Sequence, residues 1–307
     1  MIAKEVVAGS KILVVDDYDT DRLLFQEFVQ ASGYQVILAT DGREALRILL
    51  DNPNLALLMT DINMPDLDGI DLLKHVRYAR PHIPIIVTSA DPRILENTAL
   101  QALDINITLT KPANPETIKA VTQQALGGGY YTEELLGYLR ELVLETMNDK
   151  DPALSVTPEG KPYLRHGPEL LGDLSVVVGV SGQHLRGTVI LSGPTIWWNR
   201  LTRSVYGKKI TNSNALFDCS GEFGNQITTK VREYYLRRGI ESQQTPQMVF
   251  RGSKVELLSQ YRQPILTLPF IAVGMTDPFY LEVQIAHRGE ESKVEIEIQD
   301  DGELDLF

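Results

Sequence analysis

Residues 11–17 read KILVVDD, a short apolar run that ends in two adjacent carboxylates, Asp16 and Asp17. Four similar runs follow between amphipathic stretches: YQVILA (34–39), LALLMT (55–60), IPIIVTS (83–89) and INITLT (105–110). Apolar runs that alternate with helix-like segments are typical of a parallel sheet covered on both faces by helices. The sequence therefore predicts an α/β domain over residues 1–126, with a doubly wound, five-stranded parallel sheet.

Polar side chains stand at the ends of four of these runs. They are Asp16 with Asp17, Asp61, Thr88 and Lys111. In doubly wound sheets the functional crevice lies at the carboxyl ends of the strands. We therefore expect these side chains to converge on one place.

The residue types suit the transfer of a phosphoryl group to a carboxylate. An aspartate attacks a phosphoryl group only when a cation such as Mg²⁺ offsets the repulsion between the two anions. Asp16, Asp17 and Asp61 supply oxygens for such a cation. Lys111 and Thr88 supply a charge and a hydroxyl donor for the phosphoryl oxygens. Solvated helix caps would explain any single aspartate, but not the whole set.

Four motifs in this region resemble the response-regulator receiver family: VVDD (14–17), MTDINMPDLDG (59–69), TSA (88–90) and TKP (110–112). The resemblance implies that a histidine kinase phosphorylates Asp61. It implies a Mg²⁺ site formed by Asp16, Asp17, Asp61 and the backbone carbonyl of Asn63, and phosphoryl contacts from Thr88 and Lys111.

The sequence departs from this family at one position. Thr108 stands three residues before Lys111, where the family usually has a tyrosine or phenylalanine. An aromatic rotamer switch is therefore not expected here. Pro112, directly after Lys111, fixes the backbone beyond it and permits a cis peptide bond.

Three consecutive glycines, residues 127–129, mark the predicted domain boundary, because glycine carries maximal backbone freedom. Residues 130–307 contain paired β-like runs with helices grouped between them, which predicts an α+β domain. Its last segment, residues 299–307, is an acidic tail.

A predicted helix near residues 213–238 carries the main candidate site of this second domain. Its apolar stripe consists of Leu216, Cys219, Phe223, Ile227, Val231 and Tyr234. Asp218, Glu222 and Asn225 lie together on the opposite face. Gly221 and Gly224 are costly inside a helix, so something must approach the helix closely there.

A bare E-x-x-N pattern is weak evidence for a catalytic site, since any amphipathic helix has polar residues on its solvent-exposed face. Another occurs at Glu145 and Asn148, which we interpret as chance because no glycine accompanies it.

The wider context resembles the CheC/FliY/CheX family of chemotaxis phosphatases, and CheX most closely. The matching segments are GVSGQHLRGTVIL (179–191), DCSGEFGN (218–225) and TPQMVFRG (245–252), which contains the expected proline. The resemblance implies a catalytic set of Asp218, Glu222 and Asn225. Glu222 would pair with Lys111 of a docked receiver, and Asn225 would aim a water at phosphorylated Asp61. It also implies a homodimer.

Composition narrows the function classes. The formal net charge is −12, and no stripe of Lys or Arg is present, which argues against nucleic-acid binding. No apolar run approaches the ~18 residues of a membrane span, so we expect a cytoplasmic protein without membrane contact. Of the adjacent Trp197 and Trp198, we expect one in the core and the other at an interface.

These observations predict a two-component signalling protein: a receiver phosphorylated on Asp61 and a CheX-like domain that hydrolyses receiver aspartyl phosphates. One alternative is a catalytically silent binding or dimerisation module after the receiver. Another is a phosphatase for a separate receiver protein, regulated by its own receiver domain. We expect hydrolysis mainly between protomers, because the short glycine linker and a rigid helix at 130–147 would carry the receiver away from its own Glu222. A helix that folds back on its own domain would instead leave hydrolysis within one protomer open.

Overall fold

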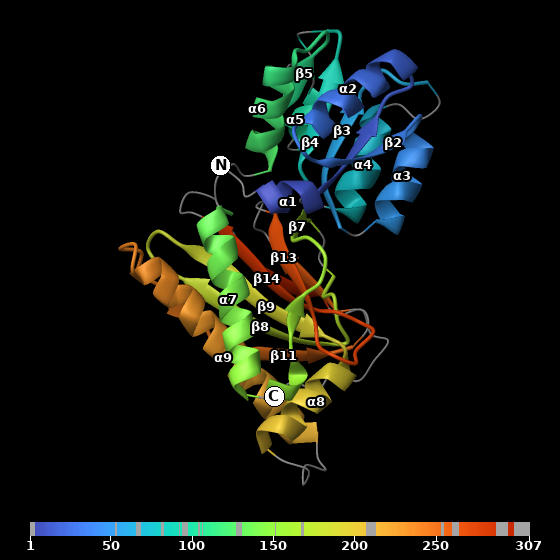
Figure 1. Cartoon of the computed structure of the whole chain (residues 1–307). Coiled ribbons are helices and arrows are strands. Elements are labelled where there is room, and N and C mark those ends of the chain that lie inside the picture. The colour runs from blue at the N-terminus through green and yellow to red at the C-terminus, as the bar shows by residue number, and fades with distance from the viewer. Residues whose placement is uncertain are drawn as a thin grey trace. The chain divides into compact units, whose positions relative to one another are not determined.

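The computed structural model describes residues 4–52, 54–65, 69–80, 83–91, 93, 98–103, 105, 107–126, 131–150, 152–166, 169–206, 213–252, 255–259, 264–286 and 294–297 (Figure 1). The chain divides into two compact units. The first comprises Met1–Thr132, Tyr163–Gly167 and Arg262–Pro264, and the second comprises Glu133–Pro162, Pro168–Tyr261 and Ile265–Phe307.

The first unit is built on a five-stranded parallel sheet of order β2-β1-β3-β4-β5. Its strands are β1 (Lys11–Val15), β2 (Gln35–Ala39), β3 (Leu55–Asp61), β4 (Ile85–Ser89) and β5 (Thr108–Thr110). The prediction of a doubly wound, five-stranded parallel sheet is confirmed. Every residue of β3 and β4 is buried, as the continuous apolar runs require.

Five helices alternate with these strands: α2 (Asp19–Ala31), α3 (Gly42–Asp51), α4 (Gly69–Ala79), α5 (Thr98–Ala102) and α6 (Pro115–Ala125). Hydrogen bonds between capping side chains and first-turn amides determine where two of these helices begin. The Asp41 side chain accepts hydrogen bonds from the first-turn amides of α3, and Asn114 caps α6 through the Thr117 amide at 2.8 Å.

An additional N-terminal helix, α1 (Lys4–Gly9), was not predicted, and strand β7 (Tyr163–Arg165) belongs to the same unit. The Ser10 hydroxyl donates to the Val6 carbonyl at 2.7 Å and accepts from the Leu164 amide at 3.0 Å. Residues 163–167, which we assigned to the second domain together with the rest of 130–307, therefore group with the first unit.

The second unit contains a mainly antiparallel sheet of order β10-β8-β9-β14-β13-β6, with β11 also pairing with β8. Its strands are β6 (Thr157–Pro158), β8 (Leu174–Ser181), β9 (Arg186–Gly193), β10 (Gln243–Gln244), β11 (Met248–Arg251), β13 (Ile265–Ile271) and β14 (Phe279–Ala286). Strands β12 (Glu256–Ser259) and β15 (Val294–Glu297) form a separate pair. The antiparallel pairing agrees with the α+β prediction for this part of the chain.

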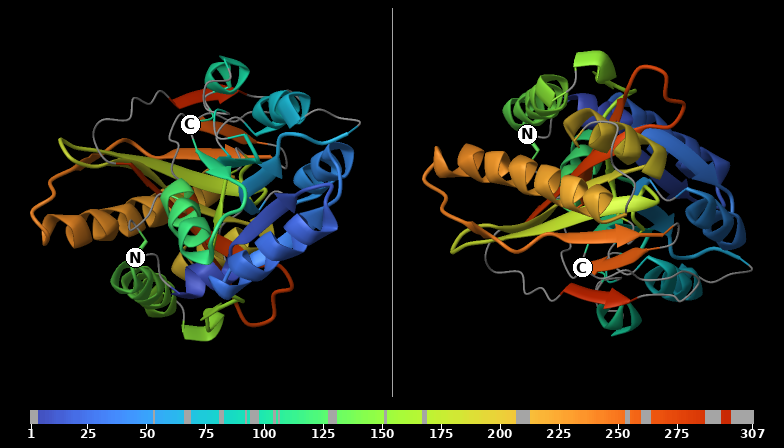
Figure 2. Two further views of the ribbon diagram at one scale, coloured as in Figure 1. Left: turned by 90° about the horizontal axis from the view of Figure 1, so that it is seen from above. Right: turned by 90° about the horizontal axis from the view of Figure 1, so that it is seen from below.

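Helix α9 (Ser213–Leu236) packs along this sheet, against β8 and β9 (Figure 2). The predicted apolar stripe is buried along its whole length: Leu216, Cys219, Phe223, Ile227, Val231 and Tyr234. Gly224 is required by this packing, because an added Cβ would lie 2.3 Å from Val176 of β8. The close approach inferred from this glycine is thus made by the sheet of the same unit.

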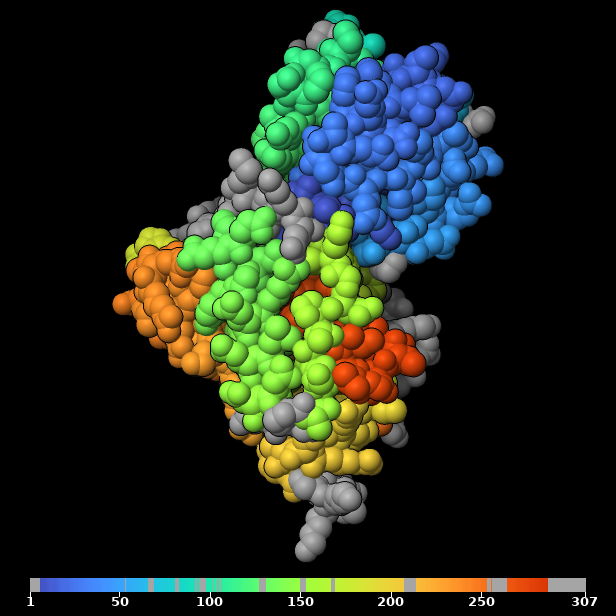
Figure 3. Space-filling model, in the orientation of Figure 1, coloured from blue at the N-terminus to red at the C-terminus, as the bar shows by residue number. Residues whose placement is uncertain are grey.

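Helix α7 (Glu133–Lys150) folds back on its own unit rather than standing alone. The Tyr138 hydroxyl donates to the Lys230 carbonyl at 2.7 Å, and the Tyr138 ring lies 4.9 Å from that of Tyr234. Figure 3 shows α7 and α9 side by side on the surface. The prediction of a free-standing rigid helix, on which the preference for hydrolysis between protomers rested, is therefore wrong.

Helix α8 (Thr195–Tyr206) and the short 3₁₀ helix η2 (Pro152–Leu154) complete this unit. Trp197 and Trp198 are both fully buried in α8, so the expectation that one reaches an interface is wrong. Trp197 stacks on Phe279 with ring centroids 4.0 Å apart, and the Trp198 indole donates to the Leu174 carbonyl at 3.0 Å.

The predicted glycine linker, 127–129, and the acidic tail, 299–307, lie outside the described residues. Among the helices that the structure does describe, none is long and apolar enough to cross a membrane.

Candidate functional site

Three carboxylates meet at the carboxyl edge of the parallel sheet of the first unit. Asp16 follows β1 and is completely buried, and Asp61 ends β3 and is 5% exposed. Together with Asp17 they can offer oxygen atoms that all lie within 4.8 Å of one another. Thr88, also buried, is the register partner of Asp61 on β4. The predicted convergence of these strand ends is observed.

Lys111, after β5, joins the carboxylates. Its Nζ lies 2.6 Å from Asp61 Oδ2, 2.8 Å from Asp16 Oδ2 and 3.0 Å from Asp21 Oδ2. Burial lowers the pKa of the Lys111 ammonium, but its hydrogen bonds to the three carboxylates outweigh this effect and raise the pKa above its ordinary value. The lysine therefore remains a cation within the site.

Asp21 was not predicted as a site residue from the sequence. It lies in the first turn of α2, four residues after Asp17, and its only signal was this helical spacing toward the same edge of the sheet.

Burial dominates the electrostatics of Asp16. It raises the pKa of the Asp16 carboxyl, although hydrogen bonds from Lys111 and from the Tyr18 amide act in the opposite direction. A cation beside this carboxyl, such as the Lys111 ammonium, favours the ionised form of Asp16.

The residues present fit a bound Mg²⁺. Asp17 Oδ1 is buried and makes no hydrogen bond with the residues that the structure describes, so it has an unused lone pair for a metal. Asn63 follows Asp61 closely, and its amide donates to Asp61 Oδ1 at 3.1 Å.

The backbone near Lys111 takes the form that its proline permits. The Lys111–Pro112 peptide is cis, and the Lys111 amide donates to the Ser89 carbonyl at 2.8 Å. Thr108, in place of the usual aromatic residue, is half-buried on β5 and pairs with Val87.

Comparison with known proteins supports the interpretation of the first unit. The response regulator receiver domain matches residues 12–123. A chemotaxis protein CheY homolog of Campylobacter jejuni is 36% identical over 123 residues, which cover 39% of this chain and 94% of that protein. The chain belongs to the response-regulator receiver family.

Two further similarities extend less far. The regulatory protein PhoP of Bacillus subtilis is 36% identical over 113 residues, but the match covers only 46% of PhoP. A solved CheX structure from Desulfovibrio desulfuricans covers 49% of this chain and 99% of its own, with 21% identity and a TM-score of 0.42. At that score the likeness decides neither the fold nor the activity of the second unit.

Family membership gives the first unit its general role. Receiver domains are phosphorylated by histidine kinases and bind Mg²⁺ at an acidic cluster of this kind. The receiver domain of this chain is thus a two-component signalling module.

The three predicted polar residues of α9 line one open hollow in the second unit. Asp218 and Glu222 are exposed, and Asn225 is partly buried. The hollow, of about 790 Å³, is also lined by Asp149 of α7 and by Gln247.

Both central side chains of this hollow are held by hydrogen bonds. Asn225 Nδ2 donates to Gln247 Oε1 at 2.7 Å. The Glu222 carboxylate accepts from the Tyr206 hydroxyl at 3.2 Å and from Gln226 Nε2 at 2.9 Å. Partial burial, reinforced by the Glu222 contact, raises the pKa of Tyr206. Sequence reasoning identified neither Gln247 nor Tyr206, because each comes from a segment outside α9.

The second E-x-x-N pattern has no comparable setting. Asn148 Oδ1 accepts the Val156 amide at 3.1 Å, which is a local backbone contact, and Glu145 is exposed outside the lining of the hollow. The interpretation of this pattern as chance stays a prediction.

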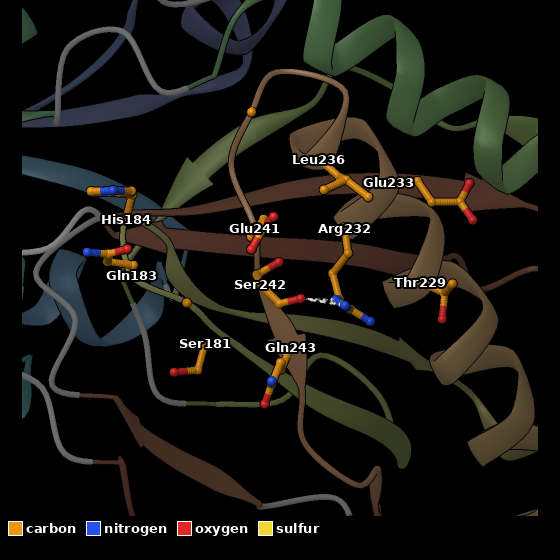
Figure 4. A pocket seen from close by; sticks show the side chains of 12 residues that line it. Ser181, Gln183, His184, Thr229, Arg232, Glu233, Leu236, Glu241, Ser242 and Gln243 are labelled. Atoms are coloured by element: carbon orange, nitrogen blue, oxygen red, sulfur yellow. Dashed lines mark hydrogen bonds between the residues drawn. The ribbon is translucent and has the colours of Figure 1, made fainter.

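A separate hollow of about 840 Å³ lies near the C-terminal end of α9 (Figure 4). Arg232 is turned toward the 239–243 segment, where its guanidinium donates to the Ser242 carbonyl. None of the predicted site residues lines this hollow.

Proposed function

We propose that this protein is a cytoplasmic response regulator that is phosphorylated on Asp61 and carries its own CheX-like aspartyl-phosphate phosphatase. The observation that carries the second part is the shared hollow of Asp218, Glu222 and Asn225 on one face of α9. A hollow of that size could admit the loop that presents an aspartyl phosphate.

In the first reaction, an Asp61 oxygen forms a bond to phosphorus while the bond from phosphorus to the donor histidine breaks. The electron pair of that bond remains on the histidine nitrogen. Mg²⁺, held by Asp16, Asp17 and Asp61, would supply charge neutralisation. The Lys111 ammonium and the Thr88 hydroxyl would bind the phosphoryl oxygens.

In the second reaction, a water oxygen attacks the phosphorus and the bond to the Asp61 oxygen breaks. The products are inorganic phosphate and the free carboxylate. We assign the orientation of the water to the Asn225 amide, which can both donate and accept. Glu222 would pair with Lys111 of the docked receiver, and Asp218, at the same hollow, would add negative charge for that docking.

The competing proposal is a silent binding or dimerisation module, and a paired substitution tests it. Full-length wild type, Glu222→Ala and Glu145→Ala are phosphorylated with acetyl phosphate and freed of donor, and the decay of the phosphate is followed. Glu145 is the matched control, being an exposed helical glutamate outside the hollow. Slower decay for Glu222→Ala alone supports the phosphatase; equal decay of all three supports the silent module.

The substrate is a receiver, either its own or that of another protein. To separate these cases, Asp61→Asn protein, which retains the phosphatase, is added to phosphorylated Glu222→Ala protein, which retains only the phosphate. Decay that accelerates with the concentration of the first protein shows action between molecules, as a homodimer or a separate receiver would require.

A further inference from the structure

Gln247 is placed to control the amide that the proposed reaction depends on. Its Oε1 accepts the hydrogen bond from Asn225 Nδ2 at 2.7 Å, while Gln244 Nε2 donates a longer hydrogen bond to Asn225 Oδ1 at 3.4 Å. An asparagine amide otherwise rotates through a broad, two-fold torsional profile. A short hydrogen bond to one side of the amide therefore restricts which way its nitrogen and oxygen face.

The backbone that carries Gln247 is anchored to the sheet. The Thr245 amide donates to the Gly179 carbonyl at 2.9 Å, and the Thr245 hydroxyl accepts from the Gly179 amide at 3.0 Å. Pro246 follows, with its fixed φ angle. The base of the Gln247 side chain is thus tied to β8, independently of α9.

Gly221 makes room for the Gln247 side chain. A Cβ added at Gly221 would lie 3.1 Å from Gln247 Cγ and 3.3 Å from its Nε2. The side chain of Gln247 therefore lies directly over this glycine, one helical turn before Asn225. Gly224 packs against the sheet instead, so the two glycines of the motif serve different contacts.

We propose that Gln247 is a positioning residue, which holds the Asn225 amide in the orientation that directs the attacking water. Gly221, which has no side chain, leaves the space that the Gln247 side chain occupies. This inference rests on the proposed phosphatase function. Gln247 acts through Asn225 and is not itself assigned contact with the substrate.

The test compares full-length wild type, Gln247→Met, Gln247→Glu, Asn225→Ala and the double variant Gln247→Met/Asn225→Ala. Each is phosphorylated with acetyl phosphate and Mg²⁺, the donor is removed, and the first-order decay of the aspartyl phosphate is measured. Methionine keeps the length of the side chain but removes the acceptor oxygen, whereas glutamate keeps an acceptor. Melting temperatures check that each variant is folded.

We expect Gln247→Met to slow the decay about tenfold, the size of one lost hydrogen bond in the transition state. Gln247→Glu should decay faster than Gln247→Met. In the Asn225→Ala background, Gln247→Met should change nothing further, because its only route is through Asn225.

The outcomes separate the two claims. Decay of Asn225→Ala as fast as wild type overturns the proposed phosphatase itself. If Asn225→Ala is slow but Gln247→Met matches wild type, the positioning role is wrong while the phosphatase stands. Additive losses in the double variant, or no recovery with glutamate, also overturn the positioning role.

A second pair of variants perturbs Gln247 without replacing it. Gly221→Ala pushes against the Gln247 side chain, whereas an added Cβ at Gly137, on α7, meets nothing within 4 Å. We expect slower decay for Gly221→Ala and wild-type decay for Gly137→Ala. Equal decay of the two would show that the clearance has no role.

Discussion

The Lys111 ammonium lies 2.6 Å from the Asp61 carboxylate, in a receiver site where Asp16 is also within its reach. The lysine therefore stabilises the unphosphorylated carboxylate with the same charge that a phosphoryl group on Asp61 would require. On the proposed function, a phosphoryl group on Asp61 would share the Lys111 charge with these carboxylates, and the same lysine would be the partner of Glu222.

Asp61→Asn should abolish phosphorylation, because the nucleophilic carboxylate is replaced by an amide. Incubation with labelled acetyl phosphate and Mg²⁺ should add one base-labile phosphate to the wild type and none to the variant. Equal labelling of the two proteins would show that another residue is the acceptor.

Asp17→Asn should weaken Mg²⁺ binding by more than tenfold, because one carboxylate of the site loses its charge. Titration with Mg²⁺, followed by the rate of labelling, measures the change. Excess EDTA should stop labelling of the wild type. Labelling that persists in EDTA, or an unchanged Mg²⁺ titration of the variant, would contradict this metal site.

Lys111→Ala should slow hydrolysis of the aspartyl phosphate by the second unit more than it slows phosphorylation of Asp61, because Glu222 would lose its proposed partner. Among molecules that do become labelled, the decay should slow about tenfold, and Glu222→Ala should add little in this background. Independent losses from the two substitutions would argue against the pairing.

Tyr34 gives the receiver a specific sensitivity to alkaline pH. Its hydroxyl is buried without a hydrogen bond to any described residue, and burial raises the pKa of Tyr34 from 10.0 to about 12. In the unfolded chain the Tyr34 hydroxyl ionises at a lower pH than in the folded protein. The contribution of neutral Tyr34 to the free energy of unfolding is therefore complete below pH ~10 and falls by about 2 kcal/mol by pH ~12.

Tyr34→Phe should remove this loss and change stability at neutral pH by less than about 1 kcal/mol, since no described hydrogen bond is broken. Urea unfolding followed by circular dichroism measures both proteins between pH ~9 and ~12. Parallel stability curves for the two would contradict the assignment.

Much of the first unit follows from its sequence, because β1, β3 and β4 are buried, mainly apolar runs that end at polar residues. Asp16, Asp61 and Lys111 meet because parallel strands end at one edge of the sheet. Helix α1 escaped prediction because six residues are too few for a helical period to be recognised.

In the second unit, the stripe of α9 predicted its buried face, but the surroundings of the polar face depend on tertiary structure. Gln247 reaches Asn225 from a segment in which Thr245 is anchored to Gly179, and no local sequence pattern encodes that contact. Likewise, the helical offset between Trp197 and Trp198 predicted different environments, yet both are enclosed within the unit.

The lifetime of the aspartyl phosphate in wild type and Asn225→Ala is the most direct test of a receiver that carries its own phosphatase. Both full-length proteins are labelled on Asp61, freed of donor and followed at the same concentration, with melting curves to confirm folding. We predict a lifetime at least about tenfold longer for Asn225→Ala, because the attacking water would lose its guide. Equal lifetimes in two equally folded proteins would contradict the account.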